Sequence, residues 1–342
     1  MEKIIETLYS LEQINEREYR EFHDLCGAPL FYDWRFLQAA ENSPLLPVKA
    51  TYYLTMRIGG KITAFMPIYL QRMDIVDPFK VLEQKADMYN SGDDYGLFSH
   101  VMHCFNSTIL NSSDDPNVYY ELMLCAREMG EAVGARYFGL LNVEPSPLLT
   151  QSKQTSMQVN YMFDRYYVDL PNFSHFNHFV ECLPYDGRGE MRRQMRKFTN
   201  SGARASIVAP PFDQRLEQLC ELCFQTTARH GTPQYFPARP LASFCRQCGD
   251  LIRLNLIERD GELLAGMVCF QEQGRLHLWS AGMKYEGLGF SPYTICFANA
   301  YQYAFEQGLQ RVEAGRLNAK IKTRLGLQPL PLYAVTSRTP LC

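Results

Sequence analysis

The chain has 342 residues, a length typical of two domains. Its residues are 46% hydrophobic and 21% charged, a composition typical of a folded chain and not of a disordered one. The formal net charge of −3, from 34 basic and 37 acidic residues, argues against a dedicated duplex-DNA-binding protein. The longest apolar run, residues 263–270, is far shorter than the ~20 residues of a membrane-spanning helix. The first residues alternate charged and apolar side chains and lack a signal-peptide core, so we expect a cytoplasmic protein with no membrane span.

Two stretches of the chain predict β-hairpins with the same layout. Residues 53–70 are two apolar-rich runs separated by Gly59-Gly60, and residues 254–270 repeat this arrangement around Asp260-Gly261. Both dipeptides are turn formers that join neighbouring antiparallel strands.

Each hairpin is followed by a helix and a further strand. Helical spacing extends over residues 119–133 in the first half and over residues 293–305 in the second, and each helix leads through a glycine into an apolar run. The repeated order predicts duplicated α+β domains, residues 1–150 and 160–342. The segment between them is polar and proline-containing, and we interpret it as a linker.

The cysteines allow two interpretations. Eleven are present, and Cys220-x-x-Cys223 with Cys245-x-x-Cys248 has a spacing close to that of a four-thiolate zinc site. Both pairs also continue the i, i+3, i+4 spacing of the apolar residues around them. We favour buried helical cysteines and predict no metal site.

Four stretches together carry a family resemblance. They are Pro29-Leu-Phe-Tyr-Asp-Trp-Arg-Phe-Leu, the basic segment 183–197, Leu264-Ala-Gly-Met, and Glu313-Ala-Gly-Arg followed by Lys320, Lys322 and Gly326. In this order the chain resembles the GNAT acyltransferase superfamily, and more narrowly its tandem-GNAT, FemAB-like group of N-acyltransferases. The resemblance implies two tandem GNAT-like domains, each a mixed, mainly antiparallel sheet flanked by helices. It also implies that the C-terminal domain binds the donor and is catalytic, with a non-catalytic N-terminal partner.

The resemblance also points to a donor-binding loop. Catalytic GNAT domains usually carry R/Q-x-x-G-x-G/A, and this chain has Lys284, Gly287 and Gly289 at similar spacing. Ser291-Pro292 then provides a helix N-cap and a proline at the first helical position, where an anion is favoured. We expect Lys284, Gly287, Gly289 and Ser291 to bind the phosphate of the donor.

A second basic stretch lies on the predicted helix that opens the C-terminal domain. Arg188, Arg192 and Arg196 follow at i, i+4 spacing, with Arg193 beside them. Phosphate of the donor, an RNA backbone or acidic residues of the other domain would each explain this stripe. We assign Arg192 and Arg193 to donor binding.

Three residues are candidates for the chemistry. Glu313 lies on a predicted strand beside small residues, as a base or as an anchor for the substrate amine; a salt bridge to Arg316 or Lys320 is the alternative. His230 follows a helix and has a suitable ordinary pKa, although a histidine before a glycine is also a common helix cap. Tyr285 is a candidate phenol donor.

The substrate-binding candidates come from both halves of the chain. Arg316, Lys320 and Lys322 form a basic cluster after Glu313, which is either a carboxylate or phosphate site or a solvated loop. Asp93 and Tyr95 follow a Ser-Gly turn in the first half and are expected to face the same cleft.

These features predict an N-acyltransferase that joins an acyl thioester to a small-molecule amine. The expected donor is acyl-CoA or the phosphopantetheine of a carrier protein, with no tightly bound cofactor. The alternatives are a FemAB-like aminoacyltransferase that uses aminoacyl-tRNA, and a GNAT-fold binding protein that has lost catalysis.

Overall fold

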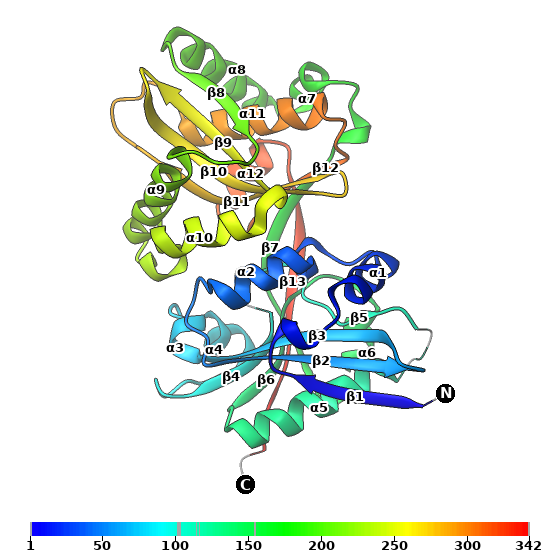
Figure 1. Ribbon diagram of the computed structural model, residues 1–342. Helices are drawn as coiled ribbons and strands as arrows, with labels where there is room; N and C mark the ends of the chain where they lie inside the picture. Colours follow the sequence, from blue (N-terminus) through cyan, green and yellow to red (C-terminus); the bar gives the residue numbers. More distant parts are fainter. Residues whose placement is uncertain (1, 101–103, 114, 116, 154, 341–342) are drawn as a thin grey trace. The chain divides into compact units, whose positions relative to one another are not determined.

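The chain forms two compact units in the computed structural model, which describes residues 2–100, 104–113, 115, 117–153 and 155–340. Unit 1 comprises Met1–Phe163 with Pro331–Cys342, and unit 2 comprises Asp164–Leu330 (Figure 1). These bounds differ from the expected 1–150 and 160–342 because the last strand of the chain lies in unit 1.

Unit 1 is a sheet with the strand order β1-β2-β3-β4-β6-β13. Neighbouring strands are antiparallel except for the parallel pair β4 and β6. The strands are β1 (Lys3–Leu8), β2 (Ala50–Ile58), β3 (Lys61–Arg72), β4 (Tyr95–Ser99), β6 (Tyr137–Val143) and β13 (Gln328–Arg338), with β5 (Leu110–Asn111) beside β3. The helices are α1 (Glu16–Cys26), α2 (Trp34–Asn42), α3 (Met73–Val76), α4 (Val81–Ala86), α5 (Val118–Val133) and α6 (Pro147–Lys153). Figure 1 shows α1 and α2 on one face of this sheet and α5 on the other.

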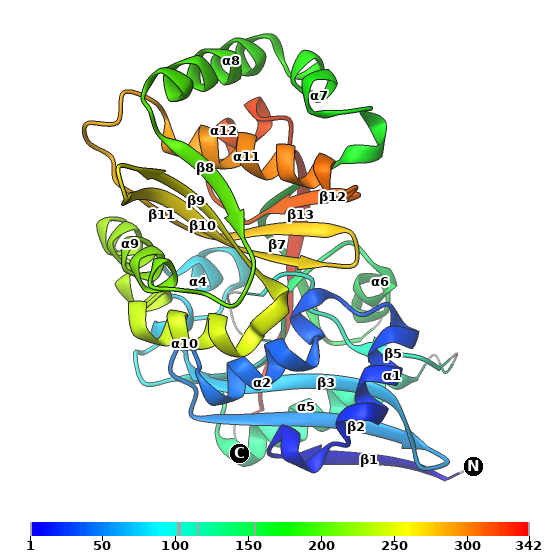
Figure 2. The same ribbon diagram turned by 45° about the horizontal axis from the view of Figure 1, so that its top comes forward.

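Unit 2 repeats this plan with the strand order β7-β12-β11-β10-β9-β8. Here the single parallel pair is β11 and β12. The strands are β7 (Gln158–Asp169), β8 (Arg204–Val208), β9 (Ile252–Arg259), β10 (Glu262–Glu272), β11 (Arg275–Met283) and β12 (Arg311–Ala314). The helices are α7 (Phe176–Cys182), α8 (Tyr185–Asn200), α9 (Arg215–Arg229), α10 (Ala238–Cys248), α11 (Pro292–Glu306) and α12 (Ala319–Arg324). In Figure 2, α8, α11 and α12 lie on one face of this sheet, and α9 and α10 lie on the other.

The expected hairpins and helices are present in both units. β2 and β3 meet at Gly59-Gly60, where both residues have positive φ (59° and 81°), as a tight hairpin turn requires. The predicted α+β duplication is therefore confirmed: each unit contains a hairpin, a third antiparallel strand, a helix and a parallel strand. The segment between the expected domains is not an irregular linker, because Pro147–Lys153 form α6 and β7 begins at Gln158.

Each sheet is completed by a strand from the other half of the sequence. The C-terminal half of β7 pairs with β12 in unit 2, whereas β13, at the end of the chain, pairs with β6 in unit 1. The two copies of the repeat have therefore exchanged their last strands, which explains why no single cut in the sequence separates the units.

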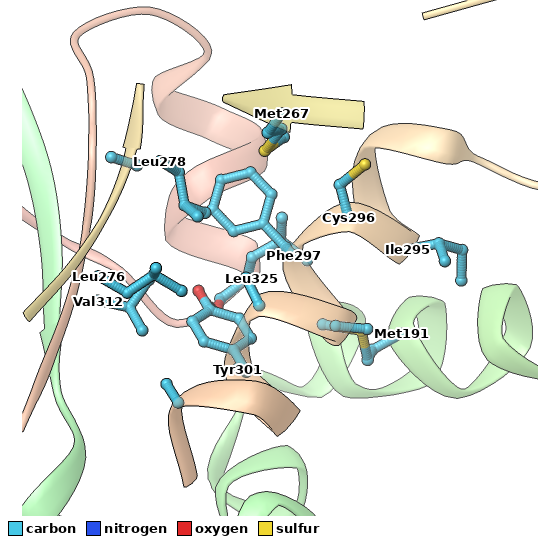
Figure 3. Packing of buried hydrophobic residues seen from close by; sticks show 14 of the residues in the cluster. Met191, Met267, Leu276, Leu278, Ile295, Cys296, Phe297, Tyr301, Val312 and Leu325 are labelled. Carbon is cyan, nitrogen blue, oxygen red and sulfur yellow. Dashed lines mark hydrogen bonds between the residues drawn. The ribbon is translucent and has the colours of Figure 1, made fainter. Parts of the chain in front are cut away.

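The core of unit 2 lies between its sheet and α11. Phe297 and Tyr301 of α11 point toward Leu276 and Leu278 of β11 and Val312 of β12 (Figure 3). The Tyr301 hydroxyl donates to the Leu325 carbonyl at 2.9 Å, so its polar atom is satisfied inside the core. Truncating a buried aromatic residue of this kind to alanine typically costs about 3–5 kcal/mol.

The four cysteines of the two CxxC pairs are buried in helices α9 and α10, which pack against each other. Burial raises the pKa of the Cys223 thiol, so it remains protonated at neutral pH. Among the described residues, no three or more His, Cys, Asp or Glu side chains are grouped so that they could hold a metal ion.

Candidate active site

The strands β11 and β12 run side by side for only a short distance. Four residue pairs form their parallel ladder, from Arg275↔Arg311 to Leu278↔Ala314. β12 then ends, while β11 continues to Met283 beside β10. The N–H of Met283 donates to Thr226 Oγ1 on α9, at 3.2 Å. The two parallel strands therefore separate after the pair Leu278↔Ala314, one pair beyond His277↔Glu313.

Glu313 lies at the centre of a buried ionic cluster beside this separation. Its Oε2 accepts a hydrogen bond of 2.5 Å from Arg165 Nη1 on β7, and the same oxygen is 3.3 Å from His277 Nδ1 on β11. All three side chains are buried, at 1–5% exposure. The salt bridge expected with Arg316 or Lys320 is therefore replaced by one with Arg165, which is 148 positions away in the chain.

The remaining oxygen of Glu313 is buried and has no hydrogen-bond donor within the described residues. Two further guanidinium groups lie near it: Arg275 Nη1 at 3.7 Å and Arg311 Nη1 at 3.9 Å. Arg311 is itself held by Asp169 at 2.6 Å and lies over the ring of Tyr167. Glu313 Oε1 therefore retains an unused capacity to accept a hydrogen bond.

Glu313 is a weak base in this environment. Burial works to raise the pKa of its carboxyl, but the hydrogen bond with His277 and the positive charge of Arg165 outweigh burial. The pKa falls well below its ordinary value, so the carboxylate stays ionised at neutral pH. It can orient a partner or attract a cation, but it has little tendency to accept a proton.

The imidazole of His277, in contrast to the Glu313 carboxylate, is held in its neutral form. Burial lowers the pKa of its imidazole, and the positive charges of Arg165 and Lys322 add to this effect, although Glu313 opposes it. The ring is therefore neutral at pH 7. Because an ionised carboxylate can only accept hydrogen bonds, the proton of the neutral ring is on Nδ1, facing Glu313, and Nε2 carries the lone pair.

Lys322 of α12 is an unusually buried lysine, only 4% exposed. Its ammonium donates to the carbonyl oxygen of Gly315, directly after β12, and lies 5.3 Å from the centre of the Tyr166 ring. Burial, with a contribution from Arg316, lowers the pKa of Lys322 to about 7. Lys322 therefore fixes α12 against the end of β12.

The other members of the expected basic cluster lie in different surroundings. Arg316 is half-buried, and burial lowers its pKa while the nearby Tyr235 opposes this effect. Lys320 is exposed on α12. The structure thus separates three cations that are close in sequence into one buried, one half-buried and one solvated side chain.

The expected donor loop leads into α11 as predicted. Gly287 and Gly289 have positive φ of 75° and 72°, and the Ser291 hydroxyl caps the helix by accepting from the Thr294 N–H at 3.4 Å. The N–H of Ser291 donates to Gln194 Oε1 of α8 at 2.6 Å. Lys284 forms an ion pair with Glu262 across the β10–β11 hairpin.

His230 and Tyr285 lie outside the ionic cluster around Glu313. His230 is the exposed C-cap of α9, and its N–H donates to the carbonyls of Thr226 and Thr227, which is the capping alternative. Tyr285 is 47% exposed, with the Arg229 guanidinium 4.3 Å from its ring centre.

Arg192 and Arg193 are exposed on α8, where they form ion pairs with Glu181 and Glu190. Asp93 and Tyr95 belong to unit 1. The Asp93 side chain is fully solvated, and the Tyr95 ring is covered by the Lys49 ammonium at 4.2 Å.

Two central residues, Arg165 and His277, were not among the sequence candidates. Both occupy positions in apolar strands where a charged or polar side chain faces the interior. That signal is visible in the sequence, since an arginine or histidine in such a strand needs a partner. The identity of the partner depends on the pairing of β7, β12 and β11, which joins distant parts of the chain.

The domain family described as acetyltransferase (GNAT) domain matches residues 186–323. This stretch of unit 2 is therefore similar to GNAT acetyltransferase domains. The match includes nearly all of α8 and α12, the β11–β12 ladder and the loop 284–291.

Solved structures extend this similarity to the fold of the entire chain. FemX has a TM-score of 0.63 at 10% identity, with 98% of this chain and 97% of FemX covered. A tandem GNAT protein from the clavulanic acid biosynthesis pathway has a TM-score of 0.57 at 11% identity, with both chains fully covered. L-PGS from Bacillus licheniformis has a TM-score of 0.55 at 12% identity, with 94% of this chain and 91% of L-PGS covered. At these identities the similarity defines the tandem GNAT fold and not the substrates.

No protein of curated function matches the chain significantly. In the described residues, no helix is both long enough and apolar enough to cross a membrane.

Proposed function

We propose that unit 2 transfers an acyl group from a thioester donor to a small-molecule amine. The observation that carries this proposal is the neutral His277 held by the ionised Glu313 at the point where β11 and β12 separate. A neutral imidazole oriented by a carboxylate is suited to remove a proton from an attacking amine.

The reaction balances with the residues of this cluster. The amine nitrogen attacks the thioester carbonyl carbon and transfers one proton to His277 Nε2. The tetrahedral intermediate then breaks its carbon–sulfur bond, and the departing thiolate takes the proton back from His277. The products are an amide and a free thiol. Glu313 holds the imidazole and stabilises the imidazolium that forms between these steps.

The separation of β11 from β12 supports a donor with an extended arm. Beyond Leu278 the backbone of β11 continues without a ladder to β12, and a strand edge of this kind binds an extended chain through amide hydrogen bonds. Phosphopantetheine, the arm of both CoA and carrier proteins, contains amides that suit this edge. The phosphate-bearing end then lies near the loop 284–291 and the N-terminus of α11, where negative charge is favoured.

The equivalent position in unit 1 is filled by its own chain. β6 extends past its ladder with β4, and Asn142 on this extension donates to the Cys104 carbonyl at 2.8 Å. The N–H of Ser107 donates to the Asn142 carbonyl at 3.2 Å. Because the segment 104–107 occupies the side of β6 that the departing β4 leaves, we assign donor binding and catalysis to unit 2.

The test is a search for the amide product. The protein is incubated with acyl-CoA, acyl-carrier-protein and aminoacyl-tRNA donors and with a panel of amines, and mass spectrometry detects new amides. An amide formed from a thioester donor supports the proposal. Binding of donors without turnover favours a GNAT-fold binding protein, and product from aminoacyl-tRNA alone favours the second candidate.

That second candidate is aminoacyl transfer from tRNA, and a specific feature of α8 favours it. Arg196 and Lys197 on its C-terminal half and Arg204 at the start of β8 are exposed. No ion pair involving these three is found within the described residues, whereas Arg192 and Arg193 are paired. RNA binding at this surface predicts that Arg196→Glu weakens the use of aminoacyl-tRNA and that RNase abolishes activity.

A further inference from the structure

The burial pattern of the helix α12 is the reverse of that of an ordinary surface helix. It buries a charged side chain, Lys322, at 4% exposure, while the neighbouring Ile321 is 42% exposed. Leu317, four positions earlier, is 79% exposed. Among the described residues of unit 2, these are the only large aliphatic side chains on the surface. A single exposed leucine is common, but two on one turn beside a buried lysine require a reason.

This aliphatic pair lies at the end of β12. The chain leaves Ala314, passes through Gly315, and returns as α12, which Lys322 fixes by donating to the Gly315 carbonyl. Leu317 and Ile321 therefore lie within a few residues of Glu313, on the turn that begins where β12 separates from β11.

The surroundings of the pair are cationic. Residues 316–324 contain Arg316, Lys320, Lys322 and Arg324 and no acidic residue. Lys320 is exposed beside Ile321, and Arg324 forms an ion pair with Asp186 of α8 at 2.8 Å. α12 is also fixed in place, because a Cβ at Gly187 of α8 would lie 1.9 Å from the Arg324 carbonyl oxygen. The surface is thus an aliphatic pair beside one exposed cation, Lys320, and the half-buried Arg316.

We propose that Leu317 and Ile321 form the docking site for an acidic carrier protein that delivers the acyl group on its phosphopantetheine thiol. This inference rests on the proposed acyl transfer and specifies how the donor arrives. A helix that presents apolar side chains among carboxylates complements both the aliphatic pair and the cations. RNA supplies no aliphatic surface, and one short turn is too small for stable binding to a membrane surface.

The experiment compares one acyl group on two carriers. Octanoyl-loaded acyl carrier protein and octanoyl-CoA are each supplied to the wild-type protein and to the Leu317→Ser/Ile321→Ser variant. The variant is expected to raise the KM for the carrier-bound donor at least about tenfold, because it removes both apolar side chains of the docking site. The KM and kcat for octanoyl-CoA remain unchanged, which also verifies that the variant is folded.

Matched controls keep the outcome decisive. Leu25→Ser removes a leucine that is 74% exposed in unit 1 and leaves both donors unaffected. Leu317→Ser alone is the milder variant, because the Leu317 side chain is more exposed than that of Ile321. Equal kinetics with the carrier-bound donor in wild type and double variant overturn the docking site, and so does an equal loss with both donors.

A binding measurement with the carrier protein distinguishes failure of the docking site from failure of the proposed reaction. Isothermal titration of the loaded carrier protein measures docking even when no amide forms from any donor, a result that would contradict only the proposed function. No binding, or equal binding to wild type and variant, overturns the docking site. A change from dimer to monomer in the variant would instead identify a second copy of this chain as the occupant and would also overturn it.

Discussion

His277 Nδ1 lies 3.3 Å from Glu313 Oε2 across the parallel pair β11 and β12, and both side chains are buried. The two groups influence each other in a defined direction. Glu313 stays ionised because cations surround it, and His277 stays neutral because burial outweighs the attraction of Glu313. In the proposed reaction, the histidine therefore transfers the proton and the carboxylate orients the histidine.

The pH dependence of acyl transfer follows from this assignment. The pKa of His277 is lowered from 6.5, so its basic form persists below that pH. The kcat/KM of the wild type is expected to rise with pH, with the half-maximal point of this rise below pH 6.5. His277→Gln removes this acidic limb, whereas His178→Gln on the exposed face of α7 retains it. An identical acidic limb in His277→Gln would contradict the assignment.

Glu313→Gln is expected to destabilise unit 2 strongly. The substitution leaves the Arg165 guanidinium buried without its carboxylate, which costs about 3–5 kcal/mol in comparable pairs. The free energy of unfolding in urea measures the effect. Glu181→Gln is the matched control, because it breaks an exposed pair with Arg192 that contributes about 0–1 kcal/mol. Similar losses in the two variants would contradict the buried character of the cluster.

The same carboxylate gives the protein an acid-sensitive stability. Because the pKa of Glu313 is lower in the folded protein than its ordinary 4.5, the stabilisation is fully present above pH 4.5. It is lost progressively as the pH falls toward the lower, folded value. The Leu317→Ser variant keeps this pH dependence, and Glu313→Gln loses it. Unfolding free energies measured between pH 3 and pH 6 test the difference.

The burial of Lys322 predicts that the free energy of unfolding also changes at alkaline pH. Its pKa is lowered from 10.5 to about 7 in the folded protein, so the unfolded chain binds more protons between these values. The free energy of unfolding is therefore expected to gain a contribution that increases from pH 7 to pH 10. Lys322→Met lacks this increase, while Lys320→Met, which alters an exposed lysine, preserves it. Parallel curves for the wild type and Lys322→Met would contradict the burial of this ammonium.

Two glycines of α8 provide a test of the contact that fixes α12. A Cβ at Gly187 would lie 1.9 Å from the Arg324 carbonyl oxygen, whereas nothing lies within 4 Å of a Cβ at Gly189. Gly187→Ala is expected to lower the melting temperature, and Gly189→Ala to raise stability by about 0.5–1 kcal/mol through helix propensity. Thermal unfolding of both variants checks the pair. Stabilisation by Gly187→Ala would show that α12 is not held against α8.

The sequence was informative where structure depends on neighbouring residues. The hairpin at Gly59-Gly60, the N-cap at Ser291 and the basic helix α8 follow from turn chemistry, capping and helical spacing. The exchange of β7 and β13 was not predictable in this way, because strand pairing between distant segments leaves little trace in local pattern. Our domain bounds placed the end of the chain in the C-terminal domain for this reason.

The sequence likewise predicted only some residues of the candidate site. Glu313 was identified because a carboxylate in an apolar strand needs a partner, but the identity of that partner depended on the register of β7. Lys322 was assigned to a basic cluster by sequence proximity, whereas the turn at Gly315 buries it and leaves Lys320 solvated. His277 also lies in an apolar strand and needs a partner, but no local motif identifies Glu313 as that partner, because the pairing of β11 with β12 joins distant segments.

The single-turnover rate of amide formation tests the central claim most directly. Wild type, His277→Gln and His178→Gln are each mixed with a thioester donor and an amine that together yield product, and the amide is quantified by rapid quench and mass spectrometry. The account predicts a rate about 10²–10⁴ times lower for His277→Gln and an unchanged rate for His178→Gln. Equal rates in all three proteins would contradict His277 as the base. The His277–Glu313 pair would then no longer support the proposed function.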